Sequence, residues 1–186
     1  MKVTKEQIIA ATQQWIQDVV IGCNFCPFAA KEFTNNTIRY VVETTIDLDI
    51  IGDVILEECE LMSQDSKIET TLVLLTGGFE NFDEFMNLVY GVEDFLAINS
   101  LDEQFQVASF HPLYLFQDSE EEDPANYTNR APFPTLHILR EDSVEKALLN
   151  HPNPELIPER NVKFATEKGL AYMKALSNLC LMKLYS

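Results

Sequence analysis

The apolar residues at the start of the chain recur with a helical period. Residues 4–7 (TKEQ) have the form of a capping box, in which the first and last side chains satisfy each other's backbone N–H groups. Apolar positions then repeat on one face until Gly22 ends the pattern. We therefore expect an N-terminal helix over residues 4–21, which leads directly into the segment GCNFCPF at residues 22–28.

Four later segments have the composition of strands. Residues 37–43 (TIRYVVE) are rich in β-branched and aromatic side chains, and residues 70–75 (TTLVLL) form the continuous apolar run of a strand that is covered on both faces. Residues 105–110 (FQVASF) and 135–140 (TLHILR) have similar patterns. Apolar residues with a helical period separate the first three segments, whereas no helix is expected before the fourth.

This alternation of strands and helices predicts one α/β domain over residues 1–186. A chain of 186 residues is long enough for one well-packed domain and short for two. We expect a mixed sheet of about four strands, three parallel and the fourth antiparallel, packed with helices in two or three layers. A helical extension is expected to follow the sheet, at about residues 158–184.

The predicted sheet brings polar segments to one edge. In open α/β sheets, ligands bind beyond the carboxyl ends of the parallel strands, which places residues 76–78 (TGG) and 109–111 (SFH) at one rim. An antiparallel fourth strand starts at the same rim, so its approach, residues 126–134 (NYTNRAPFP), arrives there too. The connection over residues 111–134 is long for a compact domain, and we expect it to cover a site.

The charge of the chain limits its partners. The formal net charge is −17, with only 13 Lys and Arg residues, and no basic cluster interrupts the acidic surface. Such a surface repels the phosphate backbone of nucleic acid, so we expect no nucleic-acid partner. Acidic faces of this kind are either solvated surface or a docking face for a basic partner.

The N-terminal residues also predict the compartment. Polar side chains interrupt the apolar positions there, so we expect neither a signal peptide nor a membrane span. We expect a cytoplasmic protein with no membrane partner, whose four cysteines are reduced. Cys59 and Cys180 fall at helical positions where a small buried side chain is typical.

Cys23 and Cys26 leave several kinds of chemistry open. Two thiols three residues apart can form a redox pair, as in thioredoxin-like motifs. They can also supply half of a zinc site, which His111 and either His137 or Asp118 would complete. Alternatively, Cys26 is a single reactive thiol, or the segment is a buried turn. A helix that begins directly after Cys26 would stabilise its thiolate.

Polar residues of the predicted rim are candidates for ligand contacts. His111 follows a strand and precedes a proline, where it can act as a general base or can hydrogen-bond a loop carbonyl. Arg130 lies in a proline-bounded loop, where it can bind a carboxylate or phosphate or can pair with a local Glu. The other candidate ligand-binding residues of this rim are Ser109, Asn126, Tyr127 and Asn129.

Four segments, taken together, resemble a bacterial family of uncharacterised proteins catalogued as domain of unknown function 1415. They are WIQDVVIGCNFCPFA, VASFHPLYLF, NYTNRAPFPTLHILRE and HPNPELIPERN, which occur in this order between about Thr4 and Asn161. The resemblance implies one site that contains Cys26, His111, Asn129 and Arg130.

The resemblance implies no activity. The family pattern has an apolar or small residue at the position of Cys23, which counts against a redox pair or a metal site that needs both thiols. Residues 163–186 extend beyond the family pattern and are apolar enough to dock on the domain or on a second subunit.

Three functional hypotheses follow. The main one is a small-molecule site, with Cys26 as nucleophile or redox thiol, His111 as its base and Arg130 as the anchor of an anionic substrate. The second is a binding protein without chemistry, in which residues 26–28 form a buried turn and residues 126–130 a structural clamp. The third is a metal protein that uses Cys23, Cys26 and His111. The sequence names no cofactor, reaction or oligomeric state.

Overall fold

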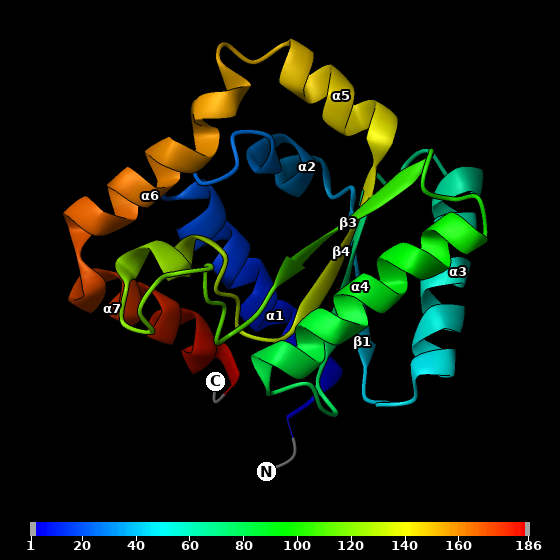
Figure 1. Ribbon diagram of the computed structural model, residues 1–186, viewed down its shortest axis with the longest axis horizontal. Coiled ribbons are helices and arrows are strands. Elements are labelled where there is room, and N and C mark those ends of the chain that lie inside the picture. The colour runs from blue at the N-terminus through cyan, green and yellow to red at the C-terminus, as the bar shows by residue number, and fades with distance from the viewer. Residues whose placement is uncertain (1–2, 185–186) are drawn as a thin grey trace.

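A four-stranded mixed sheet forms the centre of the molecule, and helices cover both of its faces (Figure 1). The computed structural model describes residues 3–184. In chain order the elements are α1 (Lys5–Trp15), the π-helix η1 (Ile16–Ile21), α2 (Ala29–Asn35), β1 (Ile38–Glu43), α3 (Leu48–Gln64), β2 (Thr70–Leu75), α4 (Phe82–Ile98), β3 (Phe105–Phe110), the 3-10 helix η2 (Pro124–Thr128), β4 (Thr135–Arg140), α5 (Glu141–Leu149), η3 (Pro154–Leu156), α6 (Ile157–Lys168), α7 (Leu170–Leu181) and η4 (Met182–Leu184).

The order of the strands is β1-β2-β4-β3, so β4 lies inside the sheet. β1 and β2 are parallel, and β4 is antiparallel to both of its neighbours. The predicted α/β class with one sheet of four strands is confirmed, but the prediction of three parallel strands is wrong. β3 runs in the same direction as β1 and β2 without pairing with either, because β4 occupies the position beside β2.

β4 is buried, as its central position leads one to expect. Thr135, Leu136 and Ile138 are buried on this strand, which has a neighbour on each edge. Its register places Thr135 opposite both Leu74 of β2 and Phe110 of β3. Strand patterns in the sequence reveal where strands occur, but they do not specify neighbours, because adjacent strands bond through backbone groups that all residues share.

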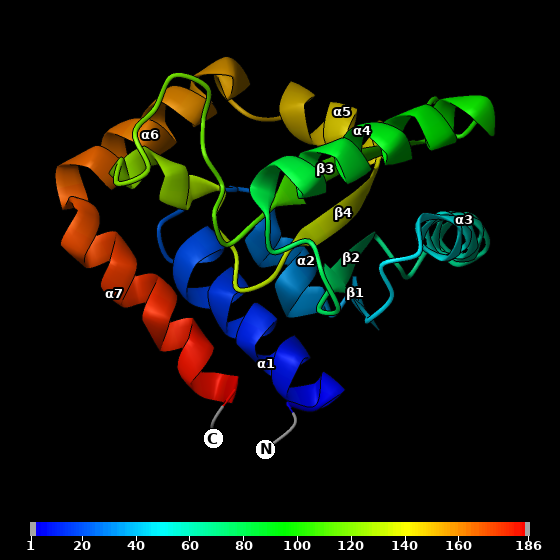
Figure 2. The same ribbon diagram turned by 60° about the horizontal axis from the view of Figure 1, so that its bottom comes forward.

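Two hydrophobic clusters form on opposite faces of the sheet. Ile51 and Ile55 of α3 pack with Phe85 and Leu88 of α4 over one face. α1, η1, α6 and α7 contribute to the cluster on the other face, with Trp15 among its buried members. Figure 2 shows α3 and α4 on one side of the sheet and α1 and α7 on the other. The fold therefore has three layers, and the carboxyl ends of β2 and β3 open between them.

The first helix is capped as its sequence indicates, and it changes its pitch before the cysteine segment. Thr4 and Gln7 form the reciprocal hydrogen bonds of a capping box at the start of α1. After Trp15 the chain continues as a π-helix, in which the N–H of Gly22 donates to the carbonyl of Gln17. A π-helical turn is rare and widens the helix, so residues 22–28 begin from an expanded helical end.

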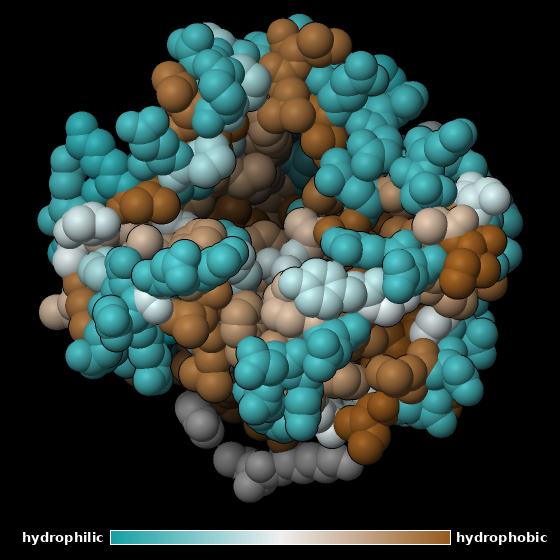
Figure 3. Space-filling model, viewed as in Figure 1, coloured by the Kyte–Doolittle hydropathy of each residue, from teal (hydrophilic) through white to brown (hydrophobic). Residues whose placement is uncertain are grey.

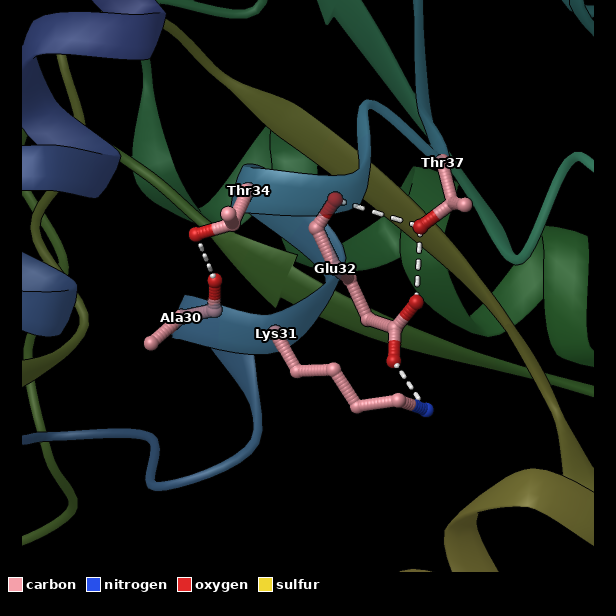
Figure 4. Close-up of polar contacts among 5 residues, drawn as sticks. All are labelled: Ala30, Lys31, Glu32, Thr34 and Thr37. Atoms are coloured by element: carbon pink, nitrogen blue, oxygen red, sulfur yellow. Dashed lines mark hydrogen bonds and ion pairs between the residues drawn. The ribbon is translucent and has the colours of Figure 1, made fainter.

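Side-chain hydrogen bonds connect α2 to the start of β1 (Figure 4). The hydroxyl of Thr37 donates to the carbonyl oxygen of Glu32 at 3.1 Å and lies 2.7 Å from its carboxylate, which pairs with Lys31 at 2.9 Å. Thr34 donates to the carbonyl of Ala30 at 2.8 Å. Asn36 then adopts a left-handed conformation, which ends α2 and turns the chain into the sheet.

The C-terminal helical segment consists of two helices. Gly169 has a φ of 79°, and its N–H donates to the carbonyl of Ala165. This glycine, whose positive φ is rarely adopted by residues with a side chain, ends α6 and allows α7 to begin in a new direction. Ala165 and Met173, one from each helix, are buried in the same cluster as α1. Within residues 3–184 no helix is both long and apolar enough to cross a membrane.

Candidate functional site

The rim at the carboxyl ends of β2 and β3 is built from three segments. The N–H of Leu75 donates to the carbonyl of Pro134, so the end of β2 lies beside the approach to β4. Thr76 donates to Glu43 at the end of β1 through both its N–H and its hydroxyl. A Cβ atom on Gly77 would overlap the carbonyl of Thr44, and only glycine permits this close approach.

His111 connects two of these segments. Its Nδ1 accepts the N–H of Leu113 at 3.0 Å, so the hydrogen of the neutral ring lies on Nε2, which donates to the carbonyl of Phe79 at 2.8 Å. The ring is fully buried and stacks on Phe85 with centroids 5.0 Å apart. Burial lowers the pKa of His111, against the smaller effects of Phe79 and Glu80. A neutral His111 therefore fixes the β2–α4 turn to the end of β3.

Arg130 fixes the long connection that follows β3. Its Nε donates to the carbonyl of Tyr114 at 3.1 Å, and its Nη2 donates to that of Glu121 at 2.9 Å. The guanidinium lies 4.6 Å from the centroid of the Tyr127 ring. Its own carbonyl accepts the indole N–H of Trp15 at 2.9 Å, which ties the connection to α1.

The neighbouring polar residues also bond mainly within this connection. Asn126 is fully buried; its Oδ1 accepts from the N–H of Phe116 and the hydroxyl of Ser119, and its Nδ2 donates to the carbonyl of Glu120. The carbonyl of Asn129 accepts the N–H of His111. Ser109 lies on β3 opposite Leu136 and is half-buried.

A hollow of about 270 Å³ opens at the rim. The motif-bearing segments that the sequence placed at this edge contribute most of its walls. Most of the lining is apolar, with one hydroxyl and one carboxylate. The lining residues are Leu75, Thr76, Gly78, Glu80, Pro112, Leu113, Pro132, Phe133 and Pro134.

The segment around Cys26 has a different set of neighbours, which come from α6. Arg160 donates to the carbonyl of Asn24, and Asn161 donates to that of Phe25 at 2.7 Å. Figure 3 shows a hollow between α5 and α6 with an apolar floor, and Figure 1 places α2 and the loop before it behind this opening. The segment GCNFCPF thus packs against the HPNPELIPERN segment.

The Cys26 thiol is half-buried and uncharged at neutral pH. Burial raises its pKa, while the backbone N–H groups of Phe28 and Ala29 and the charge of Arg160 act in the opposite direction without cancelling the effect of burial. Cys23 is buried, and burial also raises the pKa of its thiol. The two cysteines are not joined by a disulfide.

His151 is a further residue of this region, to which the sequence analysis assigned no role. Its ring contacts the edge of Phe28, with centroids 5.7 Å apart. Among residues 3–184, its Nδ1 is the one buried side-chain nitrogen or oxygen without a hydrogen-bond partner. The signal in the sequence was the segment HPNPELIPERN, in which His151 precedes a proline and Arg160 and Asn161 follow nine and ten residues later.

The structure thus divides the residues that the sequence grouped together. His111, Asn126, Tyr127, Asn129 and Arg130 belong to one bonded unit at the rim. In the part of the chain that the structure describes, no hydrogen bond, ion pair or ring contact joins Cys26 to His111 or Arg130. Nor do three or more His, Cys, Asp or Glu side chains of residues 3–184 meet in an arrangement that could hold a metal ion.

Comparison with known proteins gives a family match without a described activity. A family model described as "Protein of unknown function (DUF1415)" matches residues 7–175. No curated protein and no solved structure gives a match to the chain. The matched region includes the rim segments, the cysteine segment and the part of α6 that contacts it.

Proposed function

We propose that this chain, which belongs to the DUF1415 family of proteins of unknown function, binds a small organic molecule in the hollow at the sheet rim. The observation that carries the proposal is the position of the hollow. It lies beyond the carboxyl ends of β2 and β3, where open α/β sheets bind their ligands. Segments far apart in the sequence form its walls, as is common for ligand sites.

The lining favours a compact ligand with an apolar body. Three prolines and Phe133 supply rigid apolar walls, which lose little conformational entropy when a ligand binds. The volume of about 270 Å³ lies near the lower end of ligand pockets. On this proposal His111 and Arg130 do not touch the ligand; they hold the walls in place through their backbone partners.

Binding of small fragments, followed by amide chemical shifts, tests this proposal. We expect fragments with an apolar ring to shift the amides of residues 75–80, 113 and 133. Leu113→Trp would fill the hollow and weaken binding about tenfold, which corresponds to about 1.4 kcal/mol. Leu115→Trp is the matched control, because Leu115 lies in the same loop but does not line the hollow. Shifts confined to another surface, or equal effects of the two variants, would contradict the proposal.

A thiol-dependent activity at Cys26 is the second candidate. The arrangement that favours it is a half-buried thiol near the backbone N–H groups of Phe28 and Ala29 and the cation Arg160. From the sequence, His111 is the proposed base and Arg130 the anchor of an anionic substrate. Support for that anchoring role is that none of the ion pairs in residues 3–184 involves Arg130. The ligand contacts proposed with it are Ser109, Asn126, Tyr127 and Asn129.

The rate of alkylation of Cys26 as a function of pH distinguishes two possibilities: the thiol is influenced by Arg160 of α6, or by His111 and Arg130 as the sequence predicted. Because burial raises the pKa of this thiol, we expect alkylation to be slow at neutral pH. The rate should rise only at pH values above the pKa of a free cysteine. Arg160→Gln removes a nearby positive charge, so it should raise that pKa further. His111→Gln and Arg130→Gln should leave it unchanged.

Cys26→Ser supplies the background from the other three cysteines. An unusually low pKa of the Cys26 thiol that is lost in His111→Gln or Arg130→Gln, but kept in Arg160→Gln, would support the site predicted from the sequence, in which Cys26 lies with His111 and Arg130. A Cys26 thiol that stays unreactive at every pH would rule out a nucleophilic role. This outcome would leave the proposal for the rim hollow unaffected.

A further inference from the structure

Helices α3 and α4 leave a groove between them on the outer face of the molecule. The two helices cover the same face of the sheet and diverge from each other (Figure 2). The α4 residues that line the groove extend from Asn87 to Phe95 and recur every three or four positions. The groove therefore follows the helix for about 12 Å. The groove encloses about 240 Å³ and is lined by Leu48, Gly52, Asn87, Leu88, Gly91, Val92 and Phe95.

Two glycines inside the helices keep this groove open. Glycine in the middle of a helix is destabilising relative to alanine, because it costs more backbone entropy. A Cβ atom on Gly91 would meet no other atom within 4 Å, and its φ is not positive. Neither packing nor backbone conformation within the chain requires glycine at this position. Bare backbone at Gly91 does allow another molecule to approach the helix closely.

Exposed apolar side chains lie in the groove and just beyond it. Leu48 lines the groove at the start of α3 and is 60% exposed, and Ile98, which follows the lining residue Phe95 by three positions on α4, is 82% exposed. Phe95 is half-buried, and its ring faces Gly52. An apolar strip of this kind on a helical face is a common feature of interaction surfaces.

The helices beside the groove carry negative charge only. Neither α3 nor α4 contains a Lys or Arg residue. Glu84 precedes the groove residue Asn87 by three positions, and Asp94 follows the groove residue Gly91 by three positions. Both carboxylates therefore lie on the face of α4 that borders the groove. The exposed carboxylates of the two helices are Asp49, Asp53, Glu57, Glu60, Asp83, Glu84, Glu93 and Asp94.

From this combination we propose that the α3–α4 groove binds an amphipathic helix of another protein, with its apolar face in the groove and Lys or Arg along its flanks. An elongated apolar groove between two helices accepts a helix through side chains spaced three and four residues apart. The acidic flanks attract basic residues and fix the orientation of the partner. A second copy of the chain has a net charge of −17, which opposes self-association at this face.

A designed peptide tests this inference on the full chain. The probe is a helical peptide of about five turns, with Leu along one face and Lys elsewhere, labelled for fluorescence anisotropy at physiological ionic strength. A second peptide with Glu in place of Lys tests the role of charge. Gly91→Leu fills the groove without changing the charge, and Ala97→Leu adds a similar side chain at another exposed position of α4.

We expect the wild-type protein to bind the Lys peptide and not the Glu peptide. Gly91→Leu should weaken binding about tenfold or more, whereas Ala97→Leu should change it less than about twofold. Circular dichroism would check that both variants are folded. No binding to the wild type, equal binding of the two peptides, or equal effects of the two variants would overturn the inference. The inference would also be overturned if sedimentation showed that the wild type is a dimer and that Gly91→Leu is a monomer, because the groove would then bind a second copy of the chain.

Discussion

His111, Arg130 and Arg140 direct their polar atoms mainly to backbone carbonyl groups, although the chain has 30 acidic residues. Arg140 donates to the carbonyl of Ile68 at 2.9 Å and also to that of Met62. Each of these side chains joins segments that are distant in sequence. The sequence indicated that His111 and Arg130 matter, but it left open whether a ligand or a loop carbonyl is the partner, because either accepts the same N–H groups.

His137 supplies a prediction at the scale of a single residue. Thr70 donates its hydroxyl hydrogen to the carbonyl of Ile138, so its oxygen accepts from Nε2 of His137, at 2.7 Å. Burial lowers the pKa of His137 to about 4. The unfolded chain takes up this proton at about pH 6.5, so the free energy of unfolding should fall as the pH decreases from about 6.5 to 4, by roughly 3 kcal/mol from this group.

Urea unfolding at several pH values, with His137→Gln as the comparison, measures this effect. The variant cannot take up the proton, so its stability should fall less over the same interval. Carboxylates and His111 titrate in both proteins, and the difference between the two pH profiles therefore isolates His137. Parallel profiles would show that His137 does not lose its proton on folding.

At the scale of elements, the helix boundaries follow local chemistry. The capping box begins α1, Asn81 caps α4 by accepting the N–H of Glu84, and Gly169 separates α6 from α7. The capping box and the Asn81 cap involve residues within one turn of each other, so the sequence alone reveals them. The division at Gly169 was not predicted, because the sequence analysis expected one helical extension over about residues 158–184. The π-helix before the cysteine segment has no such local signal, because it depends on how residues 16–21 pack against the rest of the molecule.

Gly91 gives a prediction at this scale that does not depend on any partner. Because a Cβ atom there would meet no other atom within 4 Å, Gly91→Ala should increase the free energy of unfolding by about 0.5–1 kcal/mol through helix propensity. Gly22→Ala is the comparison, because its Cβ would overlap the carbonyl oxygen of Asp18 and should destabilise the protein. Denaturant unfolding measures both. A destabilising Gly91→Ala would show that the helix is constrained there by something other than its own packing.

At the scale of the whole molecule, the family resemblance and the α/β class were predictable from the sequence, and both are confirmed. All four strands occur where the sequence placed them, within one residue. The rim at which β2 and β3 end and β4 begins was also predictable, because strand direction follows from the presence or absence of a connecting helix.

The sequence by itself thus determined the features that depend on residues close together in the chain: the positions of the strands, the N-terminal helix caps and the segments that meet at the rim. Only the tertiary structure decided that β4 lies between β2 and β3, and that Arg160 and Asn161 bond the segment around Cys26. The hydrogen bonds in both cases end on backbone carbonyl groups, which every residue carries. Residue types therefore do not reveal these partners, and their identity depends on the fold.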